Sequence, residues 1–210
     1  MVDSPLENGP PFRVGTGVSV GSGGGSAYTI SDNGDLAYID GESQFTGGLR
    51  IVVAVNREGV ERTLPIPSGY LQHPRLSPDG TTLLVSRGIA AELSLPSPDI
   101  WRVDLARGAD TRLTLDAASL RPYWFPDGDR VACIRRYGQD SGLAFVRPVD
   151  GTDTPVRVGT RGVFVRGVSV SPRGDSLALV IGGGDASGGD DVWLAHVDSL
   201  HAPRPFHNAT

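Results

Sequence analysis

The residues that could carry catalytic chemistry in this sequence begin with a serine in a glycine frame. Gly17-Val18-Ser19-Val20-Gly21 matches G-x-S-x-G, the pattern that exposes a nucleophilic serine between a strand and a helix in hydrolases. A glycine- and serine-rich stretch follows it here, where a hydrolase needs a helix. We interpret the match as a chance one. The kinase elements V-A-I-K, H-R-D and D-F-G are absent from the sequence as well, so no catalytic residue is assigned.

Metal-binding and redox groups are sparse. The 4 histidines form no i,i+4 pair around a glutamate, so no zinc site is predicted. The single cysteine, Cys133, lies in an apolar stretch and is expected to be an inert buried thiol. The glycine–aspartate segments 182–185 and 188–191 are interpreted as one loop between two strands, not as a calcium site. We therefore expect no metal, no cofactor and no enzyme activity from this segment.

Composition excludes some partners. The 210 residues carry a net charge of −5, which argues against general binding to nucleic acid or to an anionic membrane. No run approaches the roughly 20 apolar residues of a membrane span. The first residues show no signal-peptide pattern, and the polar segment 1–10 is expected to be disordered.

A repeated turn motif indicates where the β-strands of this chain begin and end. Leu76-Ser77-Pro78-Asp79-Gly80 has counterparts that end at Gly34, Gly128 and Gly174, so the steps along the chain are 46, 48 and 46 residues. Proline presets φ, a short polar residue tolerates the next position, and glycine accepts a positive φ. Apolar stretches flank each copy, which is typical of a β-hairpin.

A period of about 46 residues with three to four short strands matches one blade of a β-propeller. The sequence predicts an all-β fold with four four-stranded blades, at about 27–64, 72–114, 120–158 and 165–206, within a partial propeller covering 11–210. Trp101, Trp124 and Trp193 recur with the repeat and are expected to pack between blades. Four units are the uncommon minimum for closure, so an incomplete arc of a larger ring is favoured.

These repeats resemble a known family. The Ser-Pro-Asp-Gly turn, Asp99-Ile100-Trp101 and Arg112-Leu113-Thr114 resemble the PD40, or WD40-like, repeats of TolB-type six-bladed propellers over residues 11–206. Arg173 and Asn33 depart from the turn pattern. Residues 28–38 also resemble the propeller region of some bacterial serine/threonine protein kinases. The resemblance implies binding of peptides or proteins at the channel mouth, and an extracytoplasmic or periplasmic location.

The resemblance also implies that the strand before each turn is the innermost one, which yields a candidate site. Side chains alternate along that strand, so residues five and seven positions before the turn glycine should share a polar face that lines the channel. The candidate binding residues at these positions are Thr29, His73, Arg75, Arg121, Tyr123 and Ser169. Arg166 has the opposite parity and joins this set only if a bulge intervenes. Such a cluster suits an anionic peptide partner, unless the arginines bridge to acidic residues within the channel.

Two functions remain open from the sequence. One is a non-catalytic module that binds a protein, peptide or ligand within a larger bacterial serine/threonine kinase, next to the remaining blades of the parent chain. The other is the gating propeller of a prolyl-oligopeptidase-like serine peptidase. The domains encoded beside this segment would distinguish the two.

Overall fold

The computed structural model describes residue 18 and residues 27–40, 50–56, 59–88, 98–137, 142–159, 164–182 and 189–206. Within these ranges the chain is all-β apart from one 3-10 turn, η1 (Val197–Ser199). Segment 1–10, Ser19 of the G-x-S-x-G match and residues 183–188 of the glycine–aspartate loop lie outside them. None of the described residues forms a helix with the length and hydropathy needed to cross a bilayer.

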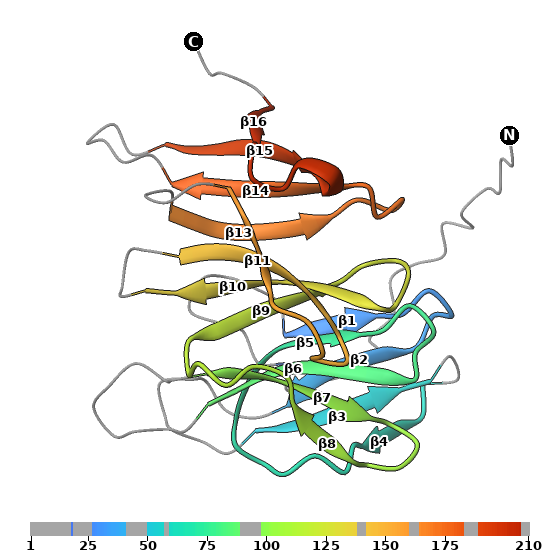
Figure 1. The fold of residues 1–210 in the computed structure, drawn as a ribbon. Coiled ribbons are helices and arrows are strands. Elements are labelled where there is room, and N and C mark those ends of the chain that lie inside the picture. Colours follow the sequence, from blue (N-terminus) through green and yellow to red (C-terminus); the bar gives the residue numbers. More distant parts are fainter. Residues whose placement is uncertain are drawn as a thin grey trace, which may run out of the picture.

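The strands form four sheets of four strands each, with neighbours in sequence order and antiparallel (Figure 1). We call these sheets blades 1 to 4. Blade 1 contains β1 (Tyr28–Ile30), β2 (Leu36–Asp40), β3 (Ile51–Val55) and β4 (Glu61–Thr63). Blade 2 contains β5 (Tyr70–Leu76), β6 (Thr82–Gly88), β7 (Asp99–Asp104) and β8 (Asp110–Arg112). Blade 3 contains β9 (Ser119–Trp124), β10 (Arg130–Arg136), β11 (Gly142–Pro148) and β12 (Val156–Val158). Blade 4 contains β13 (Phe164–Val170), β14 (Ser176–Gly182), β15 (Asp190–His196) and β16 (Arg204–Pro205).

The repeated turn joins the first two strands of every blade. Its glycine adopts a positive φ in each copy, as the sequence predicts, at Gly34 (86°), Gly80 (72°), Gly128 (74°) and Gly174 (70°). In blade 3, Asp127 accepts hydrogen bonds from the backbone N–H groups of Asp129 and Arg130 at 3.0 and 3.2 Å. Blade 4 has Arg173 at this position, and Asp175 accepts from Ser171 Oγ at 2.7 Å. In blade 4 the stabilising carboxylate is therefore that of Asp175, one residue after the turn glycine.

The core lies between successive blades. In β6, Leu83 and Val85 pack against blade 1, whereas Leu84 packs against blade 3. In β10, Cys133 faces blade 2 and Ile134 faces blade 4. Because successive side chains point to opposite faces and a blade covers each face, these strands read as continuous apolar runs. Cys133 is buried, as the sequence predicts, and burial raises the pKa of its thiol to about 12.

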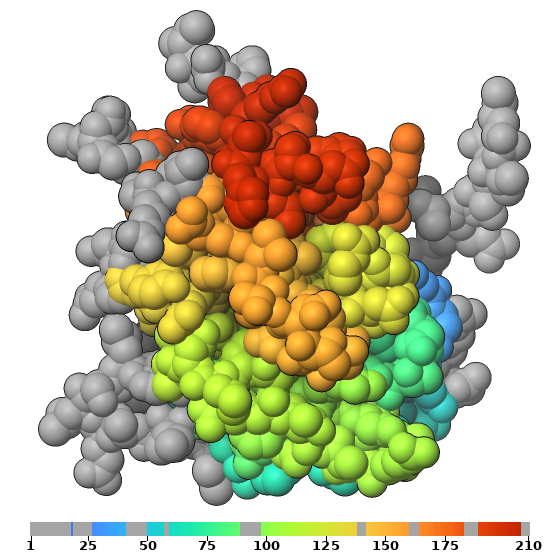
Figure 2. All heavy atoms as spheres, in the orientation of Figure 1, coloured from blue at the N-terminus to red at the C-terminus, as the bar shows by residue number. Residues whose placement is uncertain are grey.

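The first strands of the blades lie together. β5 contacts both β1 and β9, and β9 in turn contacts β13. The strand before each turn is therefore the innermost one, and the short fourth strands lie outermost. Figure 2 shows blade 4 in orange and red at the top, blade 2 in teal and green at the bottom, and part of blade 1 in blue at the side. The three tryptophans pack against the clusters between blades, as predicted.

Candidate functional site

The innermost strands of blades 2, 3 and 4 each carry a β-bulge. In β5 the residues His73 and Pro74 together oppose one residue of β6, and in β9 Arg121 and Pro122 do the same opposite β10. His73 and Arg121 hold positive φ values of 52° and 54°. In β13 the pairing shifts at Arg166, so the bulge that the sequence argument required for this residue is present.

The bulges correct the sequence argument about alternation. Strict alternation along a strand would put the residues five and seven positions before the turn glycine on the same face. In blades 2 and 3 a bulge falls between these two positions and breaks the alternation. The prediction that one uninterrupted face lines the channel is therefore wrong. What brings the side chains together is the rotation of the backbone at the bulge residues.

Four of the six predicted residues gather where blades 2 and 3 meet. The Arg75 guanidinium lies over the Tyr123 ring, with its carbon 4.7 Å from the ring centroid. Its Nη1 donates to the Pro74 carbonyl at 2.8 Å. Trp124 Nε1 donates to the Arg75 carbonyl at 2.9 Å, which fixes the two strands to each other.

His73 lies within the field of three arginines. Burial, followed by the charges of Arg121, Arg75 and Arg136, lowers the pKa of His73 to about 3. Its Nδ1 is buried and has no hydrogen-bond partner among the described residues. The imidazole is therefore neutral at physiological pH.

Arg121 reaches toward blade 4. Its guanidinium donates to the Arg166 carbonyl, and its backbone N–H donates to Ser86 Oγ at 3.2 Å. We call the group formed by His73, Arg75, Arg121, Tyr123 and Arg136 the inner arginine cluster. It spans the innermost strands of blades 2 and 3 and the end of β10.

The inner arginine cluster has no carboxylate counterion within the described part of the chain. Arg75, Arg121 and Arg136 form no ion pair with the described residues. The neighbouring Arg166 does form one, with its Nε 3.4 Å from Asp190 Oδ1. The bridges to acidic residues that would have made these arginines purely structural are not observed among the described residues.

The other two predicted residues lie elsewhere. Thr29 is only 8% exposed, and its Oγ1 accepts a hydrogen bond from the Leu76 N–H at 3.1 Å between blades 1 and 2. It therefore does not line an open channel, because its side chain is buried against the inner strand of blade 2. Ser169 is exposed on β13 and forms no side-chain hydrogen bond with the described residues.

Arg136 was missed by the sequence argument, which counted only positions on the innermost strands. It ends β10, where its backbone N–H donates to the Ala118 carbonyl at 2.9 Å, just before β9. The bulges themselves have a local signal, because Pro74 and Pro122 occupy the same place in two repeats. Proline cannot donate to a strand ladder and is confined to edges and bulges. In the described ranges no group of three His, Cys, Asp or Glu residues is placed to hold a metal ion.

The comparisons with known proteins show the fold. No family model and no curated protein matches the sequence. TolB from Acinetobacter baumannii matches with a TM-score of 0.67 and 17% identity, over 88% of this chain and 43% of that chain. The β-propeller domain of the Trilobed protease from Pyrococcus furiosus gives 0.61 and 12%, over 88% and 57%. Oligogalacturonate lyase from Vibrio parahaemolyticus gives 0.64 and 14%, over 87% and 53%.

The chain spans about half the length of these solved structures. Four consecutive four-stranded sheets with their first strands in contact agree with that likeness. The chain has the fold of a partial β-propeller of the TolB-like type.

Proposed function

We propose that this chain is a non-catalytic binding module that holds an anionic peptide segment of a protein partner at the inner arginine cluster. The observation that carries the proposal is the gathering of Arg75, Arg121 and Arg136 around a neutral His73, without a carboxylate counterion among the described residues. Guanidinium groups form paired, charge-assisted hydrogen bonds with carboxylates. In a chain of net charge −5, such a local positive site also attracts an anionic partner selectively.

Backbone strain supports the same assignment. His73 and Arg121 occupy equivalent places in two blades, and both adopt a left-handed conformation that is unfavourable for residues other than glycine. Strained residues of this kind concentrate at binding and catalytic sites. Here the strain turns both side chains toward the following blade and so assembles the cluster.

The proposal also concerns the larger protein to which this chain would belong. The resemblance of residues 28–38 to kinase-associated propellers supports a sensor or scaffold within a bacterial receptor kinase, on the extracytoplasmic side. A peptidase-gating propeller is the second candidate, supported by the fold match to the Trilobed protease propeller domain. A kinase domain encoded upstream would favour the first function, and a hydrolase domain encoded downstream would favour the second.

Peptide binding tests the site directly. Labelled peptides ending in a free carboxylate or containing glutamate are titrated onto the 210-residue chain and compared with their amidated or glutamine counterparts. We expect the anionic peptides to bind more tightly, and the Arg75→Met/Arg121→Met double variant to lose roughly 100-fold in affinity, about tenfold for each charge-assisted contact. Arg173→Met, at an exposed turn, is the matched control and keeps the wild-type affinity.

Two outcomes would contradict the proposal. One is equal binding of the anionic and neutral peptides by the wild-type chain. The other is unchanged affinity in the double variant with an unchanged circular dichroism spectrum. Because His73 is neutral above a pKa of about 3, binding is also expected to stay level as pH falls from 8 to about 5.5.

A further inference from the structure

A separate cavity of about 250 Å³ lies between blades 2 and 3. None of the residues of the inner arginine cluster lines it. Its walls come from β10 and β11, from the segment that links β8 to β9, and from the segment before β12. The lining residues are Thr114, Asp116, Ser119, Cys133, Arg135, Phe145, Arg147, Thr154 and Pro155.

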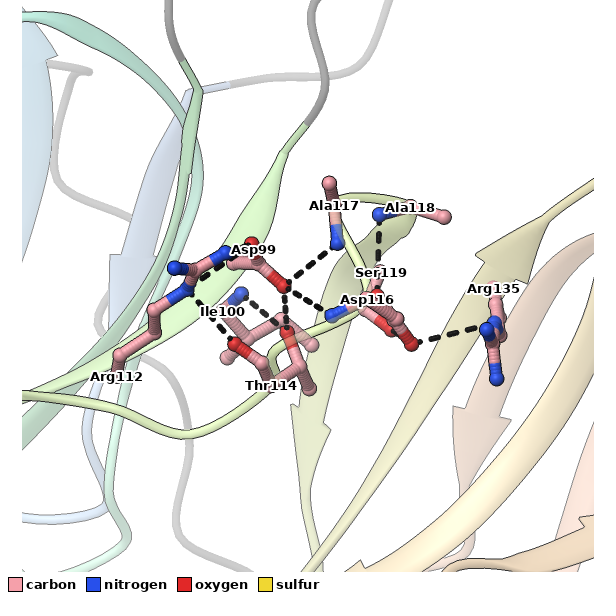
Figure 3. A network of polar contacts seen from close by, with 9 residues as sticks. All are labelled: Asp99, Ile100, Arg112, Thr114, Asp116, Ala117, Ala118, Ser119 and Arg135. Atoms are coloured by element: carbon pink, nitrogen blue, oxygen red, sulfur yellow. Dashed lines mark hydrogen bonds and ion pairs between the residues drawn. The ribbon is translucent and has the colours of Figure 1, made fainter.

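One wall of the cavity is a polar network whose groups satisfy one another (Figure 3). The buried Asp99 carboxylate accepts from Thr114 Oγ1 at 2.8 Å and from the backbone N–H groups of Asp116 and Ala117 at 3.1 and 3.2 Å. Arg112 also donates to Asp99. Asp99 thus pairs with an arginine and holds the chain segment between blades 2 and 3 in place.

Asp116 completes that wall. Its Oδ2 accepts from Ser119 Oγ at 2.8 Å and lies 3.3 Å from Arg135 Nε. Figure 3 shows Asp116 between the Asp99 network and Arg135. The charge of Arg135 is therefore already balanced by a neighbouring carboxylate.

Arg147 differs from Arg135 in having no such partner. The Nε atoms of both arginines are buried without a hydrogen bond, but within the part of the chain that the structure describes Arg147 forms no ion pair. A buried N–H group without a partner is costly, and native structures rarely leave one so. Arg147 also acts electrostatically on the thiol of Cys133, which lines the same cavity. The unpaired charge thus lies at the cavity wall.

The rest of the lining is apolar or neutral. Phe145 offers an aromatic surface, Cys133 carries a neutral thiol, and Pro155 lies at the exposed side. The volume is slightly below the usual range for drug-sized ligands, which restricts the occupant to a small molecule. A flat apolar body against Phe145 and an anionic head at Arg147 would satisfy both kinds of surface.

We infer that this cavity is a binding site for a small carboxylate with a flat apolar body, held by a paired contact between its carboxylate and the Arg147 guanidinium. The carboxylate would supply the counterion that Arg147 lacks among the described residues. Its apolar part would displace water from between the two blades. The site is independent of the partner proposed for the inner arginine cluster, so either proposal can fail without the other.

Benzoate is the probe, and benzamide is its neutral counterpart of the same shape. The ¹H–¹⁵N spectrum of the arginine Nε–H groups is recorded during titration of the full chain, with the Arg147 signal assigned by its loss in Arg147→Lys. We expect saturable shifts of the Arg147 signal with benzoate and none with benzamide. Arg147→Met is expected to weaken benzoate binding at least about tenfold, because one paired charge contact is lost.

Matched variants keep the test decisive. Arg102→Met removes an exposed arginine of β7 and is expected to bind benzoate as the wild type does. If Arg147→Met does not fold, Arg147→Lys retains the charge without the fork and should bind more weakly than wild type. Absence of saturable benzoate binding, equal binding of benzamide, or binding of inorganic phosphate at least as tight as that of benzoate would each overturn the assignment.

Discussion

At the scale of single residues, arginine carries most of this molecule's polar chemistry. The 19 lysine and arginine positions are all arginine, and several guanidinium groups stack on aromatic rings within and between blades. Arg75 lies over Tyr123 and Arg87 over Trp101, each at 4.7 Å from the ring centroid. A stacked guanidinium keeps its in-plane N–H groups free to donate, which an ammonium cannot do. The inner arginine cluster uses this property.

His73 makes the cluster sensitive to acid in a way that stability measurements can detect. Its pKa is about 3 in the folded chain and about 6.5 when unfolded, so below pH 6.5 the unfolded state takes up a proton that the folded state does not. Folding is therefore expected to lose about 1 kcal/mol for each pH unit between 6.5 and 4.5. Urea unfolding of the wild type and of His73→Asn, which tolerates the positive φ, measures this. An equally steep dependence in His73→Asn would contradict the assignment.

At the scale of elements, the hairpin turn and the bulge have opposite origins. The turn is set by neighbours in the sequence, since Pro, a short polar residue and Gly dictate its backbone angles wherever they occur. The bulge is set by pairing with the next strand, and Arg166 forms one without a following proline. Turns therefore repeat in all four blades, whereas bulge conformations differ between blades 3 and 4.

Gly128 provides a clean test of the turn. It has a φ of +74° and no atom within 4 Å of an added Cβ, so Gly128→Ala introduces backbone strain without a clash. We expect a loss of about 1 kcal/mol in unfolding free energy. Gly69 also has open space but no positive φ, so Gly69→Ala is the matched control and should match or slightly exceed wild-type stability. Equal effects of the two changes in urea unfolding would rule out strain as the cause.

The fold was largely predictable from the sequence and the site only partly. Four sheets follow from four turn signals, because hairpins are local. The position of Arg136 beside His73, and the meeting of Arg147 with Thr114 and Asp116 at one cavity, depend on contacts between segments far apart in the chain. Strand alternation alone could not supply the bulges, and it placed Thr29 at the channel when the residue is buried.

At the scale of the whole molecule, the two end blades differ from the inner ones. Blades 2 and 3 are covered on both faces, whereas the outward face of blade 4 and the first strand of blade 1 carry exposed apolar side chains. Ile30 is 61% exposed on blade 1, and Val192 and Leu194 are 41% and 38% exposed on blade 4. Apolar patches of this kind mark surfaces that associate with other protein surfaces.

Self-association of the isolated chain is the expected result. Sedimentation velocity should show a concentration-dependent increase in mass, and Leu194→Asp should shift the equilibrium toward monomer because a charge at the contact must be desolvated. Leu115→Asp, at a residue 80% exposed in the segment after β8, is the control and leaves association unchanged. A wild-type chain that stays monomeric over the whole concentration range would show that these faces do not attract one another.

The hydrogen bond from the Trp124 indole to the Arg75 carbonyl has an optical consequence. Indole emission responds to nearby charge and to the strength of its N–H bond, and here that bond ends on the residue proposed to hold a ligand. With Trp101 and Trp193 replaced by phenylalanine, occupation of the neighbouring guanidinium groups becomes readable as a change in fluorescence colour, so the chain contains its own spectroscopic reporter.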